Sequence, residues 1–225
     1  MMKLWTFSIV ARCRKTGDFG VATSTAIPCV GAMLPFAEEG VGAIATQAWV
    51  NINLGYQGME LMRLGLTVKS ALEVLLAEDP GRTRRQVVGI DKSSSFGFTG
   101  EECDEAKGHI LGEEHAVAGN ILSDKRVIEV ISESFSRSKG ELSQRLISAI
   151  EAGQAAGGDR RGKMSAALLI ASSKPKLYHD VRVDHHENPI RELRRIYEVC
   201  VKLEDEYGDD SGEEDLRRRI ARVSR

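Results

Sequence analysis

The sequence predicts an α+β domain in which two largely antiparallel sheets are sandwiched between helix layers, an αββα order. Two predicted hairpins, at residues 6–26 and 86–99, exclude a purely parallel doubly wound sheet. The expected strands carry small or apolar residues at both alternating positions, which is typical of sheets covered on both sides. Pairs of amphipathic helices follow the strands, as helix layers require. A domain with one sheet is the alternative.

The first hairpin begins with Thr6–Arg12, an alternating run rich in strand formers. The turn segment CRKTGD follows, and Gly20–Ala26 is the return strand. A turn centred on Thr16 and Gly17 gives one face four hydroxyl groups. These belong to Thr6, Ser8, Thr23 and Thr25. Such a face is unusual for a core and favours a binding site. The alternative is that threonine is simply favoured in strands.

A third strand is expected at Gly40–Ala48, after a proline-containing loop at residues 27–39. Asn51, near the end of that strand, lies in WVNINLGYQG and is a candidate for substrate binding. Its alternative role is to satisfy turn backbone. Helices are expected at residues 58–64 and 67–77, and the second ends at Asp79 and Pro80.

Three arginines stand before the second hairpin: Arg82, Arg84 and Arg85. A guanidinium matches carboxylates and phosphates, so Arg85 is a candidate ligand for an anion. A solvated turn or an oligomer contact is the alternative. The hairpin strands are expected at residues 86–91 and 96–99.

In the second half of the chain a strand followed by two helices is again expected. After a polar connection at residues 106–112, the strand HAVAGNIL ends in Gly119 and Asn120. Amphipathic helices are expected at residues 124–137 and 140–152.

The stretch GQAAGGDRRGKMSAALLI, residues 153–170, departs from this plain alternation. It places Asp159, Arg160, Arg161 and Lys163 on a glycine-rich loop before a buried strand at residues 166–170. Glycines let the backbone approach a ligand closely, and charged loops at strand ends are frequent sites. A solvated turn is the alternative.

A last strand is expected at residues 177–186, followed by a helix from Asn188. Along this strand His179 and His185 lie about 20 Å apart, and Asp184 with His186 supplies only two ligands, so no metal site is expected. Residues 1–203 are expected to form one domain, and residues 204–225 a charged tail.

The overall composition restricts the classes of function. The chain has 225 residues and a net charge of −2, which argues against a nucleic-acid partner. Its four cysteines lack zinc or disulfide spacing. No apolar run approaches the roughly 20 residues of a membrane span, and the N-terminus lacks signal-peptide features. We therefore expect a cytoplasmic protein without a membrane partner, cofactor or metal.

Several segments together resemble a known family: TFSIVAR, GVGAIATQAWVN, DPGRTRRQ, AVAGNIL and EAGQAAGGDRRGKMSAALL. They are similar to the bacterial and archaeal domain of unknown function 1028, placed in the Ntn-hydrolase (N-terminal nucleophile) superfamily. The resemblance covers roughly residues 6–200 and implies the same αββα fold. It also implies amide-bond hydrolysis by the first residue of the mature chain, whose α-amino group serves as base.

The nucleophile that this resemblance implies is Thr6. Asn120 or nearby N–H groups would stabilise the oxyanion, and Asp159, Arg160 or Lys163 would hold the substrate or tune the amine. Family members often begin with Met followed directly by this threonine, whereas here five residues precede it: Met1, Met2, Lys3, Leu4 and Trp5. Either they are removed, or the start codon lies elsewhere, or the site is not used in this way. The alternative function is a catalytically silent protein of the same fold that binds a small anionic metabolite or serves as an oligomeric interaction module. In either case a homo-oligomer is expected.

Overall fold

The fold is formed by two antiparallel sheets packed face to face, with helices outside each. The computed structural model describes residues 3–4 and 6–207. Sheet A has the order β1-β5-β6-β7, and β4 also pairs with β5. Its strands are β1 (Lys3–Leu4), β4 (Pro35–Glu38), β5 (Gly42–Trp49), β6 (Arg85–Asp91) and β7 (Ser95–Thr99).

Sheet B has the order β11-β10-β3-β2-β9-β8, and its paired strands are antiparallel. Its strands are β2 (Thr6–Arg12), β3 (Phe19–Thr25), β8 (Gly108–Leu111), β9 (His115–Gly119), β10 (Ser165–Ala171) and β11 (Asp180–Val183). The pairing places β2 and β3 at the centre of the sheet.

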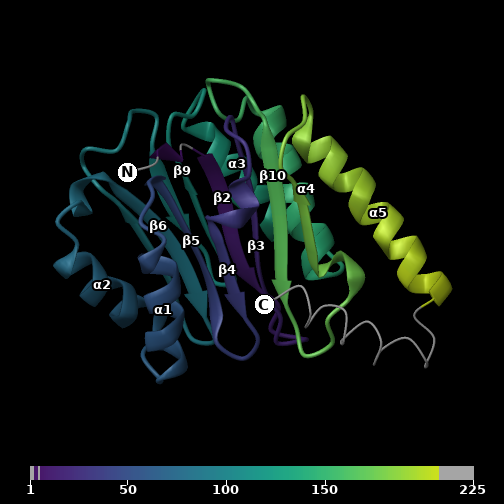
Figure 1. The fold of residues 1–225 in the computed structure, drawn as a ribbon, viewed down its shortest axis with the longest axis horizontal. Helices are drawn as coiled ribbons and strands as arrows, with labels where there is room; N and C mark the ends of the chain where they lie inside the picture. Colours follow the sequence, from purple (N-terminus) through teal and green to yellow (C-terminus); the bar gives the residue numbers. More distant parts are fainter. Residues whose placement is uncertain (1–2, 5, 208–225) are drawn as a thin grey trace.

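Helices cover the outer face of each sheet (Figure 1). Sheet A is covered by α1 (Asn53–Arg63) and α2 (Val68–Glu78), which share an apolar core with β5 and β6. Sheet B is covered by α3 (Arg126–Arg137), α4 (Leu142–Ala155) and α5 (Pro189–Tyr207). This is the four-layer αββα sandwich that the sequence predicts.

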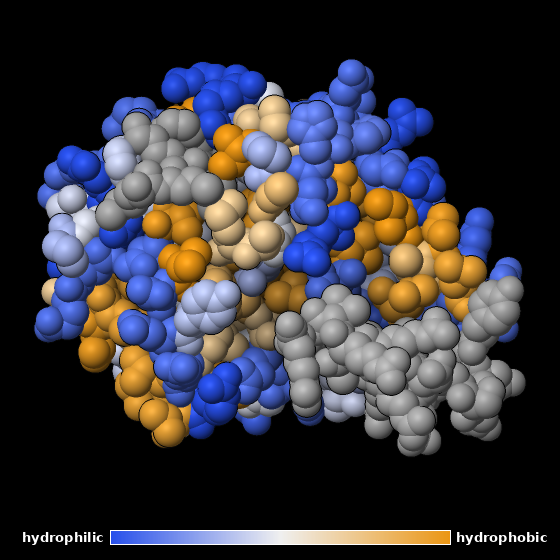
Figure 2. Space-filling view, in the orientation of Figure 1, coloured by the Kyte–Doolittle hydropathy of each residue, from blue (hydrophilic) through white to orange (hydrophobic). Residues whose placement is uncertain are grey.

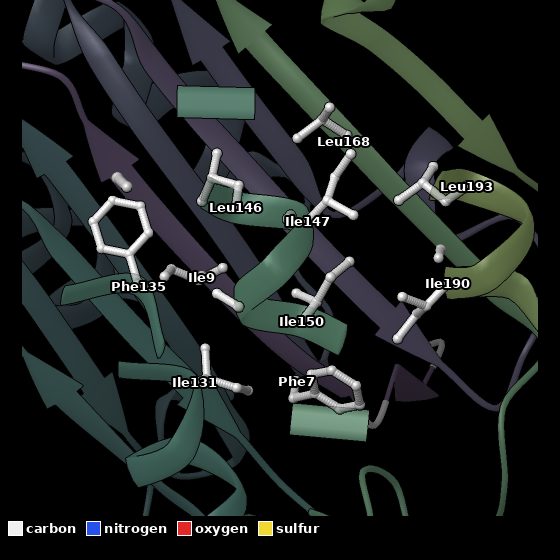
Figure 3. Close-up of a cluster of buried hydrophobic side chains, with 14 of the residues drawn as sticks. Phe7, Ile9, Ile131, Phe135, Leu146, Ile147, Ile150, Leu168, Ile190 and Leu193 are labelled. Atoms are coloured by element: carbon white, nitrogen blue, oxygen red, sulfur yellow. The ribbon is translucent and has the colours of Figure 1, made fainter. Parts of the chain in front are cut away.

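The alternation of β2 decides which of its side chains face the helices and which face sheet A. Phe7 and Ile9 point to the helices, where they pack with Ile131, Phe135 and other residues of α3 and α4 (Figure 3). Val10 belongs instead to the core between the two sheets. Because successive strand residues face opposite ways, Thr6 and Ser8 share the Val10 side and face sheet A.

Several predicted boundaries differ from the structure, and α1 begins at Asn53 rather than at residue 58. The expected loop at residues 27–39 contains β4, and the expected connection at residues 106–112 contains β8. Both are short and only partly buried, so they lack a clear apolar alternation. The last strand is β11 alone, because Leu177–His179 forms a 3₁₀ turn. Helix α5 continues through Tyr207, beyond the expected start of the tail, and residues 208–225 lie outside the described part.

The visible surface is mixed in character. Figure 2 shows apolar areas separated by hydrophilic ones. The most exposed large apolar side chains include Leu64 and Tyr56 of the α1 region. The expected homo-oligomer stays a prediction. Among the helices that the structure describes, none has the length and apolar character that a membrane span requires.

Candidate active site at Thr6

Thr6 opens the central strand of sheet B and is fully buried. Its hydroxyl group donates to the Ser24 carbonyl oxygen at 2.5 Å and lies 3.3 Å from Thr23 Oγ1. Its carbonyl oxygen accepts from the Asn120 N–H at 3.1 Å and from Gln47 Nε2 at 3.4 Å. Groups from both sheets therefore hold this residue in place.

The predicted hydroxyl face is confirmed by the register of the hairpin. Thr6 pairs with Thr25 and Ser8 pairs with Thr23, and these four residues are buried. Ser8 Oγ lies 3.0 Å from Thr23 Oγ1, within hydrogen-bond distance. The turn is centred one residue earlier than predicted, which shifts the cross-strand pairing by two residues and preserves the face because the side-chain period of a strand is two.

A chain of buried amides connects this face to sheet A. The Ser8 hydroxyl donates to Gln47 Oε1 at 2.6 Å, and Gln47 Nε2 donates to Gln86 Oε1 at 2.6 Å. Asn120 Nδ2 donates to the same Gln86 oxygen at 2.7 Å. The chain from Ser8 to Asn120 thus consists of neutral groups.

The orientation of the Asn120 side-chain amide follows from the orientation of the Gln86 side-chain amide. Gln86 Nε2 faces the carbonyl oxygens of Gly119 and Gly108 at 2.9 and 3.0 Å, so its Oε1 must receive donors. Asn120 therefore presents its NH₂ group to Gln86, and its Oδ1 is buried without a hydrogen-bond partner. A buried acceptor of this kind is a place where a donor from a ligand or substrate would bind.

The backbone after Asn120 is strained. Ile121 has a φ of +48°, which is unusual for a β-branched residue. It is only 7% exposed, and its N–H has no hydrogen-bond partner within the described residues. Strained backbone with an unused donor is typical of functional sites. Ala48, the neighbour of Gln47, also has a positive φ, +66°.

The glycine-rich loop lies beside the Thr6 end of sheet B. Asp159 forms a bridge with Leu122, and the Arg160 N–H donates to the Ile121 carbonyl at 2.9 Å. Asp159 Oδ2 accepts weakly from the Ala26 N–H at 3.4 Å, next to the strand partner of Thr6.

The charged side chains of this loop have separate partners. Asp159 is buried and pairs with Arg161 Nη2 at 2.5 Å. Lys163 Nζ reaches Asn188 Oδ1 at 2.5 Å, next to the start of α5, and the Arg160 side chain is exposed. The loop backbone therefore adjoins the site, whereas Arg160 and Lys163 lie toward its outside.

Asn51 and Arg85 form a second cluster around Asp79. The buried Arg85 binds both Asp79 oxygens, at 2.8 and 3.0 Å, and Asn51 Nδ2 donates to Asp79 at 2.8 Å. Burial acts to raise the pKa of Asp79, but these hydrogen bonds and that of the Gly81 N–H lower it below its ordinary value. Both predicted substrate-binding side chains thus have strong internal partners.

Two residues of the site were missed at the sequence level, Gln47 and Gln86. Each is an amide side chain on an apolar strand, and both are fully buried. A glutamine within a buried strand is the available signal, because a buried polar group requires a partner. Their convergence on Thr6 depends on the packing of the two sheets.

The described residues offer no metal centre. No group of three or more His, Cys, Asp or Glu side chains is arranged to hold an ion within that part of the chain. The four cysteines are free, and burial raises the pKa of Cys103 to about 11, so this thiol stays protonated.

The described residues form a four-layer αββα sandwich in which a buried threonine opens a central strand. The chain belongs to the Family of unknown function (DUF1028), whose profile matches residues 6–193. It is similar to the crystal structure of protein SPO2555 from Silicibacter pomeroyi, with 30% identity and a TM-score of 0.80. That match covers 86% of this chain and 88% of the other.

Two further solved structures match more distantly, each at 10% identity with a TM-score of 0.44. One is Thiobacillus denitrificans BPH in complex with epoxomicin, covering 76% of this chain and 100% of that one. The other is Anbu, an ancestral beta-subunit from Yersinia bercovieri, covering 92% and 99%. No curated protein matches the chain.

Proposed function

We propose that the protein is an amidohydrolase of the N-terminal nucleophile type, in which Thr6 becomes the first residue after residues 1–5 are removed. The observation that carries this proposal is the position of Thr6. It opens the central strand of an Ntn-like sandwich, it is held by donors from both sheets, and it is also the first residue of the family match. The substrate is expected to contain an amide or peptide-like bond.

The proposed reaction uses the hydroxyl and the freed amine of Thr6. The amine takes the hydroxyl proton as Oγ attacks the carbonyl carbon of the substrate. The proton then passes to the leaving nitrogen as the C–N bond breaks, which leaves an ester on Thr6. Water hydrolyses the ester and restores the hydroxyl.

The oxyanion of the tetrahedral intermediate needs a hydrogen-bond donor. The Asn120 side chain points its NH₂ group at Gln86, so we assign this role to the adjacent N–H of Ile121. One such donor contributes about 3 kcal/mol where it has been removed from other enzymes. The Asn120 backbone N–H fixes the Thr6 carbonyl, and Ser8, Thr23 and Thr25 line the same face.

In this proposal Asp159 is a positioning residue. It holds Arg161 and the backbone near Ala26, and so supports the strand end where Thr6 lies. Arg160 and Lys163 lie farther out and would contact only a substrate that extends beyond the buried face.

The test begins with a chain that starts at Thr6, produced by cleavage of an N-terminal fusion. Turnover of a panel of chromogenic amides is expected for this chain, with a loss of at least about a thousandfold in Thr6→Ala. Thr6→Ser is the matched control, because it retains a hydroxyl nucleophile. Equal turnover in Thr6→Ala would refute the assignment. Intact mass of the protein expressed with residues 1–5 then shows whether they are lost.

One observation favours the alternative of a silent Ntn-fold protein. The Thr6 hydroxyl donates to a backbone carbonyl, and its hydrogen-bonded surroundings from Thr23 to Asn120 are neutral. A silent protein of this kind would instead bind a small anionic metabolite or serve as an oligomeric interaction module, without turnover. Absence of amide hydrolysis by the chain that begins at Thr6, with the fold intact by circular dichroism, would favour this function.

A further inference from the structure

A cavity lies at the opposite end of sheet B from Thr6. Strand β2 runs from Thr6 to Arg12, about 20 Å, and the cavity begins at the turn that follows. Its volume is about 710 Å³, within the usual range of ligand pockets. Its walls come from the β2–β3 turn, the start of α4 and the segment after β10.

The cavity walls are cross-linked by a polar cluster in which Tyr178 is buried and Glu141 and Lys176 are partly exposed. Lys176 Nζ contacts Glu141 Oε1 at 3.0 Å and the Tyr178 hydroxyl at 2.7 Å. The Tyr178 hydroxyl donates to Glu141 Oε2 at 2.9 Å. The charges of Glu141 and Lys176 therefore compensate each other, and the start of α4 is fixed to the segment after β10.

Two other lysines of the cavity have no internal counter-charge. Lys15 lies on the β2–β3 turn and Lys174 on the segment after β10, and neither forms an ion pair with a described residue. The remaining carboxylate of the lining is Asp18, which accepts the Thr16 hydroxyl at 2.6 Å. With three lysines and two carboxylates in the lining, the cavity carries one net positive charge.

His179 adds a neutral donor to the same lining. It is 91% buried, and its Nδ1 accepts the Lys176 N–H at 3.2 Å. Burial lowers the pKa of His179, so the ring is neutral near pH 7 and its proton must be on Nε2. That Nε2 has no partner within the described residues.

The start of α4 faces the same space. The cap residue Glu141 makes no side-chain hydrogen bond to the first turn, so the first N–H groups of this 14-residue helix remain available. Free N–H groups at a helix start attract anions, and the start of α4 lines the same cavity as Lys15 and Lys174. Leu142 and Ile170 supply an apolar wall beside these donors.

We propose that this cavity binds a small phosphate ester, with the phosphate between Lys15 and Lys174 and the organic part against Leu142 and Ile170. A phosphate group matches the unpaired cations, and the volume leaves room for a small organic group. The site is separate from Thr6 and does not depend on hydrolysis there.

Isothermal titration calorimetry of the full chain with glycerol 3-phosphate tests this site. Lys15→Ala/Lys174→Ala is expected to raise Kd at least about tenfold. The matched control is Lys92→Ala/Lys202→Ala, which removes two exposed lysines outside the cavity and should leave Kd unchanged. Ionic strength is held constant, because salt screens exposed charges.

Three results would overturn the proposal. These are the absence of binding heat at millimolar ligand, an equal Kd in the two double variants, and binding of succinate as tight as that of glycerol 3-phosphate. Glycerol serves as the uncharged control and should not bind. Circular dichroism of each variant establishes that it is folded before titration.

Discussion

At the residue scale, the Thr6 site depends on Gln86. This side chain accepts from Gln47 and Asn120 and faces the carbonyl oxygens of Gly108 and Gly119. Since these groups are enclosed between the sheets, loss of one partner leaves several others unsatisfied. Such networks are stabilising only when they are complete.

We expect Gln86→Met to destabilise the protein by about 3 kcal/mol, because it keeps the volume but leaves buried donors and carbonyls unpaired. Urea denaturation measures the change. Gln57→Met, at an exposed position of α1, is the control and should stay within about 0.5 kcal/mol of wild type. A Gln86 variant as stable as this control would show that the network contributes no net stability.

Asp91 gives a pH-dependent contribution to stability. Its carboxylate accepts from the N–H groups of Val68, Ser93 and Ser94 at 2.6 to 2.7 Å. Burial acts to raise the pKa of Asp91, but these hydrogen bonds and the Ser93 hydroxyl lower it below its ordinary value. The folded state therefore binds this proton less readily than the unfolded state. The stabilisation is complete above about pH 4 and is lost as the pH falls through the folded-state pKa.

We accordingly expect Asp91→Asn to cost about 2 kcal/mol at pH 7 and progressively less below about pH 4. Urea denaturation of both proteins at pH 7 and pH 3 gives the two differences. Asp205→Asn, at an exposed position of α5, should show little change at either pH. An Asp91→Asn difference of the same size at both pH values would contradict a lowered pKa.

At the element scale, close contact between helices and strands requires small residues. A Cβ atom added to Gly55 in α1 would lie 2.2 to 2.6 Å from three ring atoms of Phe36 in β4. The ring is also held by an edge contact with Tyr56. Glycine at this position lets α1 approach the edge of sheet A.

Gly55→Ala therefore changes the free energy of unfolding through two opposing effects. Alanine gains about 1 kcal/mol in helix propensity, whereas overpacking typically costs about 1 to 3 kcal/mol. Because three ring atoms are overlapped, we expect a net loss of about 1 to 2 kcal/mol in the free energy of unfolding, measured by urea denaturation. Gln57→Ala on the exposed side of α1 should be neutral. A stabilised Gly55→Ala would mean that the Phe36 ring moves at no cost.

The elements also show what the sequence can and cannot predict. The hydroxyl face of β2 and β3 was predictable, because a hairpin brings together residues that are near in sequence. The position of the loop at Asp159 followed from its place before β10. Gln47 and Gln86 contact Ser8 and Asn120 only when sheet A packs on sheet B. The local periodicity of apolar residues in the sequence does not predict this packing. Likewise, β4 and β8 lie at sheet edges, where partial exposure weakens the apolar alternation.

At the scale of the whole molecule, the two sheets enclose a shared core. Val10 and Val21 from sheet B pack with Val88 and Ile90 from sheet A. The Thr6 network lies at one end of sheet B, and the lysine-lined cavity lies at the other. Strand β2 therefore connects both proposed sites through the best-covered part of the fold.

This arrangement predicts how stability is distributed along the chain. Strands β2 and β3 have a strand on each side, helices on one face and sheet A on the other. Their amides should exchange with solvent only when the whole domain unfolds. Strands β8 and β11 are the edges of sheet B and are short, so their amides should exchange through local opening, at least about a hundredfold faster. Native-state hydrogen exchange followed by NMR measures this difference. Equal protection in β11 and β2 would instead show that sheet B opens only as one cooperative unit.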